Sequence, residues 1–190
     1  MADLYGNFAA LQLKENEGVD YLICVTERAS SVAIIAPHGG KIEPHTSKIA
    51  AAIAGDVHSL YCFEGLRKRS RELHITSTNF YERKCLDLIE RCEIVVAVHG
   101  LKRKDCTVDV GGLDDDLRNA VCASLKAAGF RSKVVTKGPH AGISPDNVCN
   151  RGKIKKGVQL EIHKDLRDDF ISGKKDLKAF AESVRQAIQP

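Results

Sequence analysis

The sequence lacks the features that would assign it to a secreted or membrane class. Its seven cysteines form no CxxC pair and are odd in number, which argues against a disulfide framework or a structural zinc knuckle and for a reducing compartment. The first residues form neither a basic n-region nor an apolar h-region, and no run approaches the roughly 20 apolar residues of a membrane span. We therefore expect no signal peptide, no membrane partner and a cytoplasmic location.

An excess of one charge and a high aromatic content are also missing. The 29 Lys and Arg are interleaved with 25 Asp and Glu, and aromatic residues make up 5%. The net charge of +4 permits an anionic partner without naming one. With few aromatics and no recognised nucleic-acid motif, we expect no nucleic-acid partner. A non-catalytic anion-binding module, suggested by the basic cluster Arg67-Lys68-Arg69, remains an alternative.

What is present fits one α/β domain over residues 1–190. At 43% hydrophobic content the chain can bury a full core, and without an obvious apolar interface stripe we expect a monomer. Short β-rich runs alternate with helical patterns, which predicts an open, mixed, mainly parallel sheet flanked by helices. The expected strands are Tyr21–Val25, Val32–Ala36, Ser59–Phe63, Leu73–Thr76, Ile94–Val98, Ser132–Thr136 and Val158–Ile162. The expected helices are Thr46–Ala54, Tyr81–Arg91, Asp114–Ala128 and Asp176–Ile188.

Three of these strands end in residues that commonly bind metals. His38 follows one strand, His99 follows another, and Glu161 stands near the end of a third. Ligands of an open α/β sheet bind outside the carboxyl ends of its strands, so these residues can share one crevice. Two histidines and a carboxylate are a catalytic zinc ligand set, and a second glutamate beside the ion would carry protons. Glu43, five residues after His38, supplies the additional carboxylate.

Structural explanations for these residues remain open. The two His-Gly pairs at residues 38–39 and 99–100 also suit histidines that are hydrogen-bonded in turns, and Glu161 could be a solvated residue of an edge strand. A glutamate among Val, Leu and Ile is nevertheless costly to bury without a partner, which favours a chemical role. His74 is ambiguous between a packed core histidine and a site residue.

Two arginines are candidates for binding carboxylates, because the planar guanidinium can bind both carboxylate oxygens. Arg151 is the stronger candidate, since it follows Asn150 in an irregular loop just before the Glu161 strand. Arg118 belongs to an expected helix and could be only an exposed helix charge.

Seven motifs follow one another from about Val32 to the end of the Glu161 strand. They are PHGGxxE at 37–43, LHITST at 73–78, VHG at 98–100, VGGL at 110–113, LRN at 117–119, PDN at 145–147 with Asn150-Arg151, and GVQLE at 157–161. In this order they resemble the poly-γ-glutamate hydrolase family of phages and bacilli.

The resemblance implies a fold similar to zinc carboxypeptidases and endo-cleavage of the γ-glutamyl amide bonds of poly-γ-glutamate. It implies one zinc ion held by His38, Glu43 and His99, with Glu161 as the catalytic carboxylate. Arg151 with Asn150, and Arg118, would bind the substrate α-carboxylates, and an arginine or a histidine such as His74 would stabilise the oxyanion. Carboxypeptidases space the first ligand pair as HxxE, whereas here four residues intervene, so the ligand loop must differ.

One alternative within the same fold is a zinc amidohydrolase that cleaves a small acyl-glutamate or a peptidoglycan γ-glutamyl bond. Cleft length separates this alternative from a polymer hydrolase, and the sequence does not report it. Without a secretion signal, we expect an enzyme that meets an extracellular polymer to be released by lysis or by non-classical export.

Overall fold

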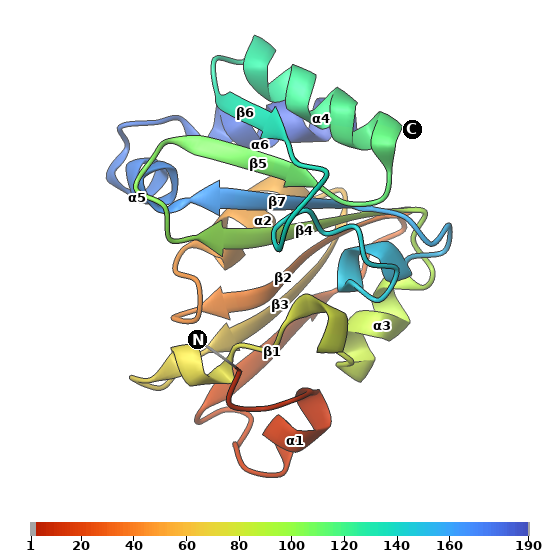
Figure 1. Ribbon diagram of the computed structural model, residues 1–190. Coiled ribbons are helices and arrows are strands. Elements are labelled where there is room, and N and C mark those ends of the chain that lie inside the picture. Colours follow the sequence, from red (N-terminus) through yellow and green to blue (C-terminus); the bar gives the residue numbers. More distant parts are fainter. Residues whose placement is uncertain (1–2, 190) are drawn as a thin grey trace.

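The computed structural model describes residues 3–189, and within them seven strands form one sheet in the order β1-β3-β2-β4-β7-β5-β6 (Figure 1). Neighbouring strands are parallel except for the pairs β1–β3 and β5–β7, which confirms the expected mixed, mainly parallel sheet. The strands are β1 Tyr21–Thr26, β2 Val32–Gly40, β3 Ser59–Gly65, β4 Ile94–Leu101, β5 Thr107–Gly111, β6 Arg131–Val134 and β7 Val158–His163. The α-helices are α1 Phe8–Gln12, α2 Thr46–Ala54, α3 Arg83–Ile89, α4 Asp115–Ala127, α5 Lys164–Ser172 and α6 Leu177–Ala187, and the 3₁₀ helices are η1 Ser70–Leu73, η2 Ser77–Asn79 and η3 Val148–Arg151.

Each face of the sheet carries its own hydrophobic core, because successive strand residues point to opposite faces. In β2, Ile34 packs with α2, α4 and α6 on one face, while Ile35 packs with α1 and α3 on the other. Figure 1 shows α3 in front of the sheet, with α2 and α6 behind it. The connections from β2 to β3 and from β3 to β4 thus cover opposite faces, so a topological switch point lies beside β2 and β4, where open α/β sheets bind ligands.

Most expected elements are confirmed, and several strands are longer than predicted. The β2 and β4 strands run on through the two His-Gly pairs, so the candidate ligands lie within the ladder rather than after it. Both long helices begin at a capping aspartate, since Asp114 accepts from the backbone N–H of Leu117 and Asp176 accepts from that of Ala179. Across residues 3–189, we find no helix with the length and apolar character needed to cross a membrane.

The expected strand Leu73–Thr76 is wrong. Buried Leu73 and Ile75 flank a half-buried His74, which explains the strand-like pattern, but the segment leaves η1 and runs on to η2. Side chains bind the backbone groups that a strand would use for pairing. The carbonyl of Ile75 faces Nε2 of His38 at 2.7 Å, and the N–H of Thr76 donates to Asp3 at 2.6 Å.

Among the strands and α-helices, β5, α1 and α5 were not predicted from the sequence. The β5 strand has only five residues, and its central Asp109 is a poor strand former by type. It is nevertheless structurally important, because it pairs antiparallel with β7 and places Asp109 opposite Glu161.

Candidate active site

A β-bulge turns His38 toward the other candidate ligands. By simple alternation His38 would share the face of Ile34 and Ala36, but the β2–β3 register gains one residue between Ala36 and Gly39. A bulge of this kind re-aims the side chains that follow it. Gly39 is needed there, since a Cβ on it would lie 2.1 Å from Oγ of Ser47 and 3.0 Å from the carbonyl oxygen of Phe63.

A short turn after the bulge brings Glu43 back to His38. The N–H of Glu43 donates to the carbonyl of His38 at 2.9 Å, and the hydroxyl of Thr46 donates to the carbonyl of Glu43 at 2.8 Å. The Glu43 carboxylate lies 3.5 Å from Nδ1 of His38 and accepts a 2.7 Å hydrogen bond from the N–H of Gly100 on β4. The five-residue spacing therefore forms a compact turn that joins the ends of β2 and β4.

His99 completes a set of three converging ligand atoms. Its Nδ1 lies 3.1 Å from Nδ1 of His38 and 3.8 Å from Oε2 of Glu43. Ligand atoms about 2.1 Å from a tetrahedral zinc ion lie about 3.4 Å apart, so the three separations are those of a metal triad. Because Nε2 of His38 faces the carbonyl of Ile75, it must be the donor, which leaves the Nδ1 lone pair for the shared centre.

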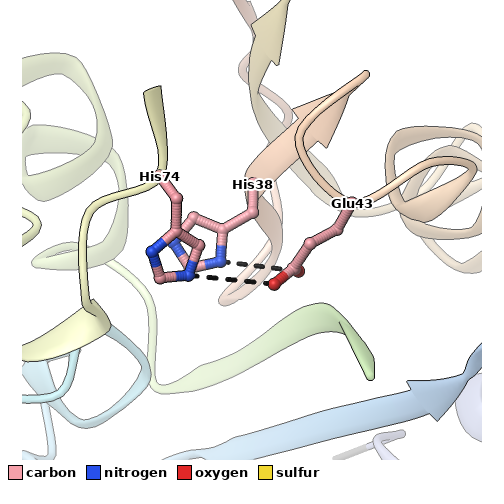
Figure 2. A group of neighbouring side chains, drawn as sticks. All are labelled: His38, Glu43 and His74. Carbon is pink, nitrogen blue, oxygen red and sulfur yellow. Dashed lines mark ion pairs between the residues drawn. The ribbon is translucent and has the colours of Figure 1, made fainter. Parts of the chain in front are cut away.

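His74 approaches the same carboxylate from the segment between η1 and η2 (Figure 2). Its Nδ1 donates to Asp3 at 2.7 Å, and its Nε2 lies 3.9 Å from Oε1 of Glu43. The His74 ring stacks on His38, with centroids 4.1 Å apart and planes at 33°. Stacking brings ring faces together rather than lone pairs, so His99 fits a ligand role better than His74. The position of His74 suits contact with a bound substrate.

The electrostatics of this cluster are those of a buried anion among imidazoles. Burial alone would raise the pKa of Glu43, but His38 and His99 hold it well below its usual range. Burial opposes the protonated form of His99, yet contact with Glu43 and the charge of Glu161 raise its pKa above the ordinary value. Within residues 3–189, Nε2 of His99 has no hydrogen-bond partner, so no hydrogen bond to a turn explains this ring. A divalent cation would satisfy the same donors once the imidazoles are neutral.

Glu161 stands beside His99 on the neighbouring strand, where β4 and β7 pair the two residues in register. Its Oε1 accepts a 3.1 Å hydrogen bond from Nε2 of Gln159 and lies 3.7 Å from Nδ1 of His140. Hydrogen bonding to Glu161 raises the pKa of His140. Glu161 is 8% exposed and lines the same cavity as His38 and Glu43, so it is not a solvated edge residue.

The cavity over these residues has a volume of about 720 Å³, and its lining residues come from segments that are far apart in the sequence. Its polar lining includes several residues that were not predicted from the sequence as site residues. They are Asp3, Arg71, Lys102, His140, Asn147 and Gln159. Sequence signals existed for two of them, since Lys102 follows the His99 strand end and Gln159 shares the alternation of Glu161. Asp3 and Arg71 reach the cavity only through the tertiary fold.

The predicted carboxylate-binding residues are Arg151, Asn150 and Arg118. None of them is part of the described lining of the cavity. Arg151 stacks 3.8 Å over the ring of Tyr81 and donates to the carbonyl of Thr78 at 3.2 Å. Arg118 is buried and donates to the carbonyl of Gly112 at 2.8 Å.

Asn150 is also buried and connects loop segments. It accepts from the N–H groups of Leu113 and Gly157 and donates to the carbonyls of Gly142 and Ser144. Together, the positions of Asn150, Arg151 and Arg118 suit support of the cavity wall.

Comparisons with known proteins agree with the motifs. The curated relatives of Bacillus subtilis (strain 168) include UPF0714 protein YndL, which is 36% identical over 167 residues, covering 87% of this chain and 66% of the relative. The SPbeta prophage-derived UPF0714 protein YoqZ is 37% identical over 174 residues, covering 90% of this chain and 62% of the relative. This chain therefore spans slightly less than two thirds of the length of these two relatives.

Two solved structures superpose over nearly the whole fold. A bacteriophage poly-gamma-glutamate hydrolase gives a TM-score of 0.93 at 31% identity and covers 98% of this chain and 96% of its own. A zinc-free form of YndL gives a TM-score of 0.92 at 31% identity, with 98% coverage of both chains. The model of the poly-gamma-glutamate hydrolase family matches residues 5–186. The chain belongs to the poly-gamma-glutamate hydrolase family.

Proposed function

We propose that this protein is a zinc-dependent hydrolase of the γ-glutamyl amide bonds of poly-γ-glutamate. The observation that carries the proposal is the convergence of three ligand atoms, on His38, Glu43 and His99, beside a buried glutamate in one cavity. Membership of the poly-gamma-glutamate hydrolase family supports the substrate, and the zinc-free state in which YndL was solved supports the metal.

The chemistry of the donor set fits one zinc ion. His38, His99 and Glu43 offer two imidazole nitrogens and a carboxylate oxygen, which leaves a fourth position of a tetrahedral site open. Bound zinc would polarise the scissile carbonyl and lower the pKa of water from ~16 toward ~7. The hydrogen bond from Gly100 to Glu43 and the contact between His38 and Ile75 orient two of these ligands in advance.

Glu161 is the proposed proton carrier. It takes the proton of the attacking water and passes it to the nitrogen of the scissile amide. Without that proton the nitrogen would be a poor leaving group. Gln159 holds one carboxylate oxygen and is itself held by Asn147, whose Nδ2 donates to Oε1 of Gln159 at 2.9 Å. This chain of contacts keeps the Glu161 side chain aimed into the cavity.

The remaining polar groups suit a substrate rich in carboxylates. Each γ-linked glutamyl unit presents an α-carboxylate beside its backbone, and Arg71 and Lys102 are exposed cations on the cavity wall. We assign α-carboxylate binding to these two residues, with Arg151 and Asn150 supporting the wall behind them. His74, held by Asp3 through Nδ1, faces the cavity, and as the imidazolium it would donate through Nε2 to the oxyanion that develops on the scissile carbonyl.

Incubation with poly-γ-glutamate tests the proposal. The zinc-loaded protein should shift the polymer to smaller sizes in size-exclusion chromatography, and the Glu161→Gln variant should leave the size distribution unchanged while keeping its zinc. An unchanged distribution with zinc-loaded wild-type protein would refute polymer hydrolysis. Release of glutamate from a small acyl-glutamate, or cleavage of a peptidoglycan γ-glutamyl bond in the same experiment, would then identify the alternative substrate.

A further inference from the structure

A second cavity of about 520 Å³ adjoins the first on the side of the turn formed by residues 41–45, which we name the ligand turn. The two cavities share Glu43, Gly100, Arg71 and Lys102, but the second does not include Glu161 among its described lining. The residues found only in the second cavity come from the ligand turn and from α5. They are Ile42, Pro44, His45, Lys164, Arg167 and Asp168.

Hydrogen bonds hold the Arg167 side chain in one position at this second cavity. Its side chain is buried, and its guanidinium donates to three main-chain carbonyls, those of Ile162, Pro44 and Leu101. Gly100 makes room for it, since a Cβ there would lie 2.7 Å from Cζ of Arg167. The glycine after His99 thus lets a cation pack directly against the strand that carries a candidate metal ligand.

This buried cation has no acidic partner in direct contact. Within residues 3–189, no carboxylate lies within 4 Å of a nitrogen of Arg167, Arg71 or Lys102. Asp168 also lines this cavity, where it pairs with Lys164 and lies 3.7 Å from His45, and the Lys164 ammonium keeps further N–H donors for a ligand. Glu43 and Glu161 act on Arg167 only from beyond 4 Å, and the charge of Glu43 would be neutralised by a bound metal. A buried arginine whose charge is unpaired is costly, and an anionic ligand would offset that cost.

We propose that the second cavity is a subsite for an α-carboxylate of a γ-linked glutamyl chain that continues past the ligand turn. In this arrangement Arg167 and Lys164 bind a glutamyl unit on the far side of Glu43 from Glu161, and Arg71 and Lys102 guide the chain between the cavities. The subsite rests on the proposed polymer hydrolysis and adds to it a second carboxylate contact, which would favour attack within a long chain.

Binding to an inactive form tests the subsite separately from catalysis. We would titrate zinc-loaded Glu161→Gln protein with poly-γ-glutamate in a calorimeter, alone and with Lys164→Glu added. Lys164 is half exposed, so this variant should fold normally. A second variant, Arg167→Lys, keeps the charge but loses the planar fork, and its melting temperature would be measured first. The matched control is Lys126→Glu, the same charge reversal at an exposed position on α4 that lines neither cavity.

We expect Lys164→Glu to weaken polymer binding roughly tenfold at low salt and less at high salt, with little change for Lys126→Glu. Equal weakening by Lys164→Glu and Lys126→Glu would mean general charge attraction and would overturn the subsite. Unchanged binding with Lys164→Glu would overturn it as well. Either result would leave polymer hydrolysis by the wild-type protein unaffected, whereas a wild-type protein that does not shorten the polymer would refute the proposed function instead.

Discussion

Replacing Asn150 with alanine should destabilise the fold rather than weaken substrate binding. The Asn150 side chain makes four hydrogen bonds with main-chain groups, at 3.2 Å from Leu113, 3.1 Å from Gly157, 2.7 Å to Gly142 and 2.8 Å to Ser144. Each hydrogen bond contributes a net stabilisation of about 1 kcal/mol. Three of the four are only partly buried, so water can replace some of them after the substitution. We therefore expect a loss of about 2–4 kcal/mol in the free energy of unfolding.

Urea unfolding followed by circular dichroism measures this loss, and thermal unfolding should show a melting temperature lower by roughly 4–16 °C for a chain of this size. The matched control is Asn119→Ala, an exposed position on α4, which should change stability by less than about 0.5 kcal/mol. If Asn150→Ala unfolded at the wild-type urea concentration and instead raised KM, the side chain would be a substrate contact and the structural interpretation would be wrong.

Three further predictions concern the active site. Chelation should abolish activity and lower the melting temperature while leaving the far-ultraviolet circular dichroism unchanged, with added zinc restoring both; activity that survives chelation would exclude the metal mechanism. Glu161→Gln should keep zinc and lower kcat by about 10²–10⁴-fold, and a near-wild-type kcat would remove Glu161 as proton carrier. Gly39→Ala should weaken zinc binding because its Cβ would displace Oγ of Ser47 and shift His38. Adding Ser47→Ala should restore part of that affinity, and no restoration would place the strain at the carbonyl of Phe63.

The architecture could be predicted because its signals are local. Runs rich in Val and Ile such as Val32–Ala36 and Ile94–Val98 favour strands by residue type, and Asp114 and Asp176 cap helices by accepting from N–H groups three residues further on. The segment at 73–76 shows where local signals fail. Its alternation is that of a strand, but its backbone groups bind His38 and Asp3, which lie far away in the sequence.

The candidate ligands could be predicted for a similar reason. Parallel strands bring their carboxyl ends to one edge, so the sequence predicts that His38, His99 and Glu161 lie close together. In the structure His99 contacts His38 and pairs in register with Glu161. The carboxylate-binding arginines depended instead on the direction of long side chains. Arg151 stacks on Tyr81 and Arg118 binds a backbone carbonyl, while Arg71 and Lys102 line the cavity. No periodicity in the sequence encodes those directions.

The sequence by itself determined the family, the order of the core elements and the residue types at the strand ends, because these depend on side-chain chemistry and on contacts close along the chain. The tertiary structure decided which atoms face one another. The bulge after Ala36 turns His38 toward His99, and the packing of Arg167 against Gly100 places a cation behind the ligand turn. Both depend on contacts between residues far apart in the sequence, such as Ala36 with Cys62 and Leu101 with Arg167, whose geometry is settled only when the sheet is assembled.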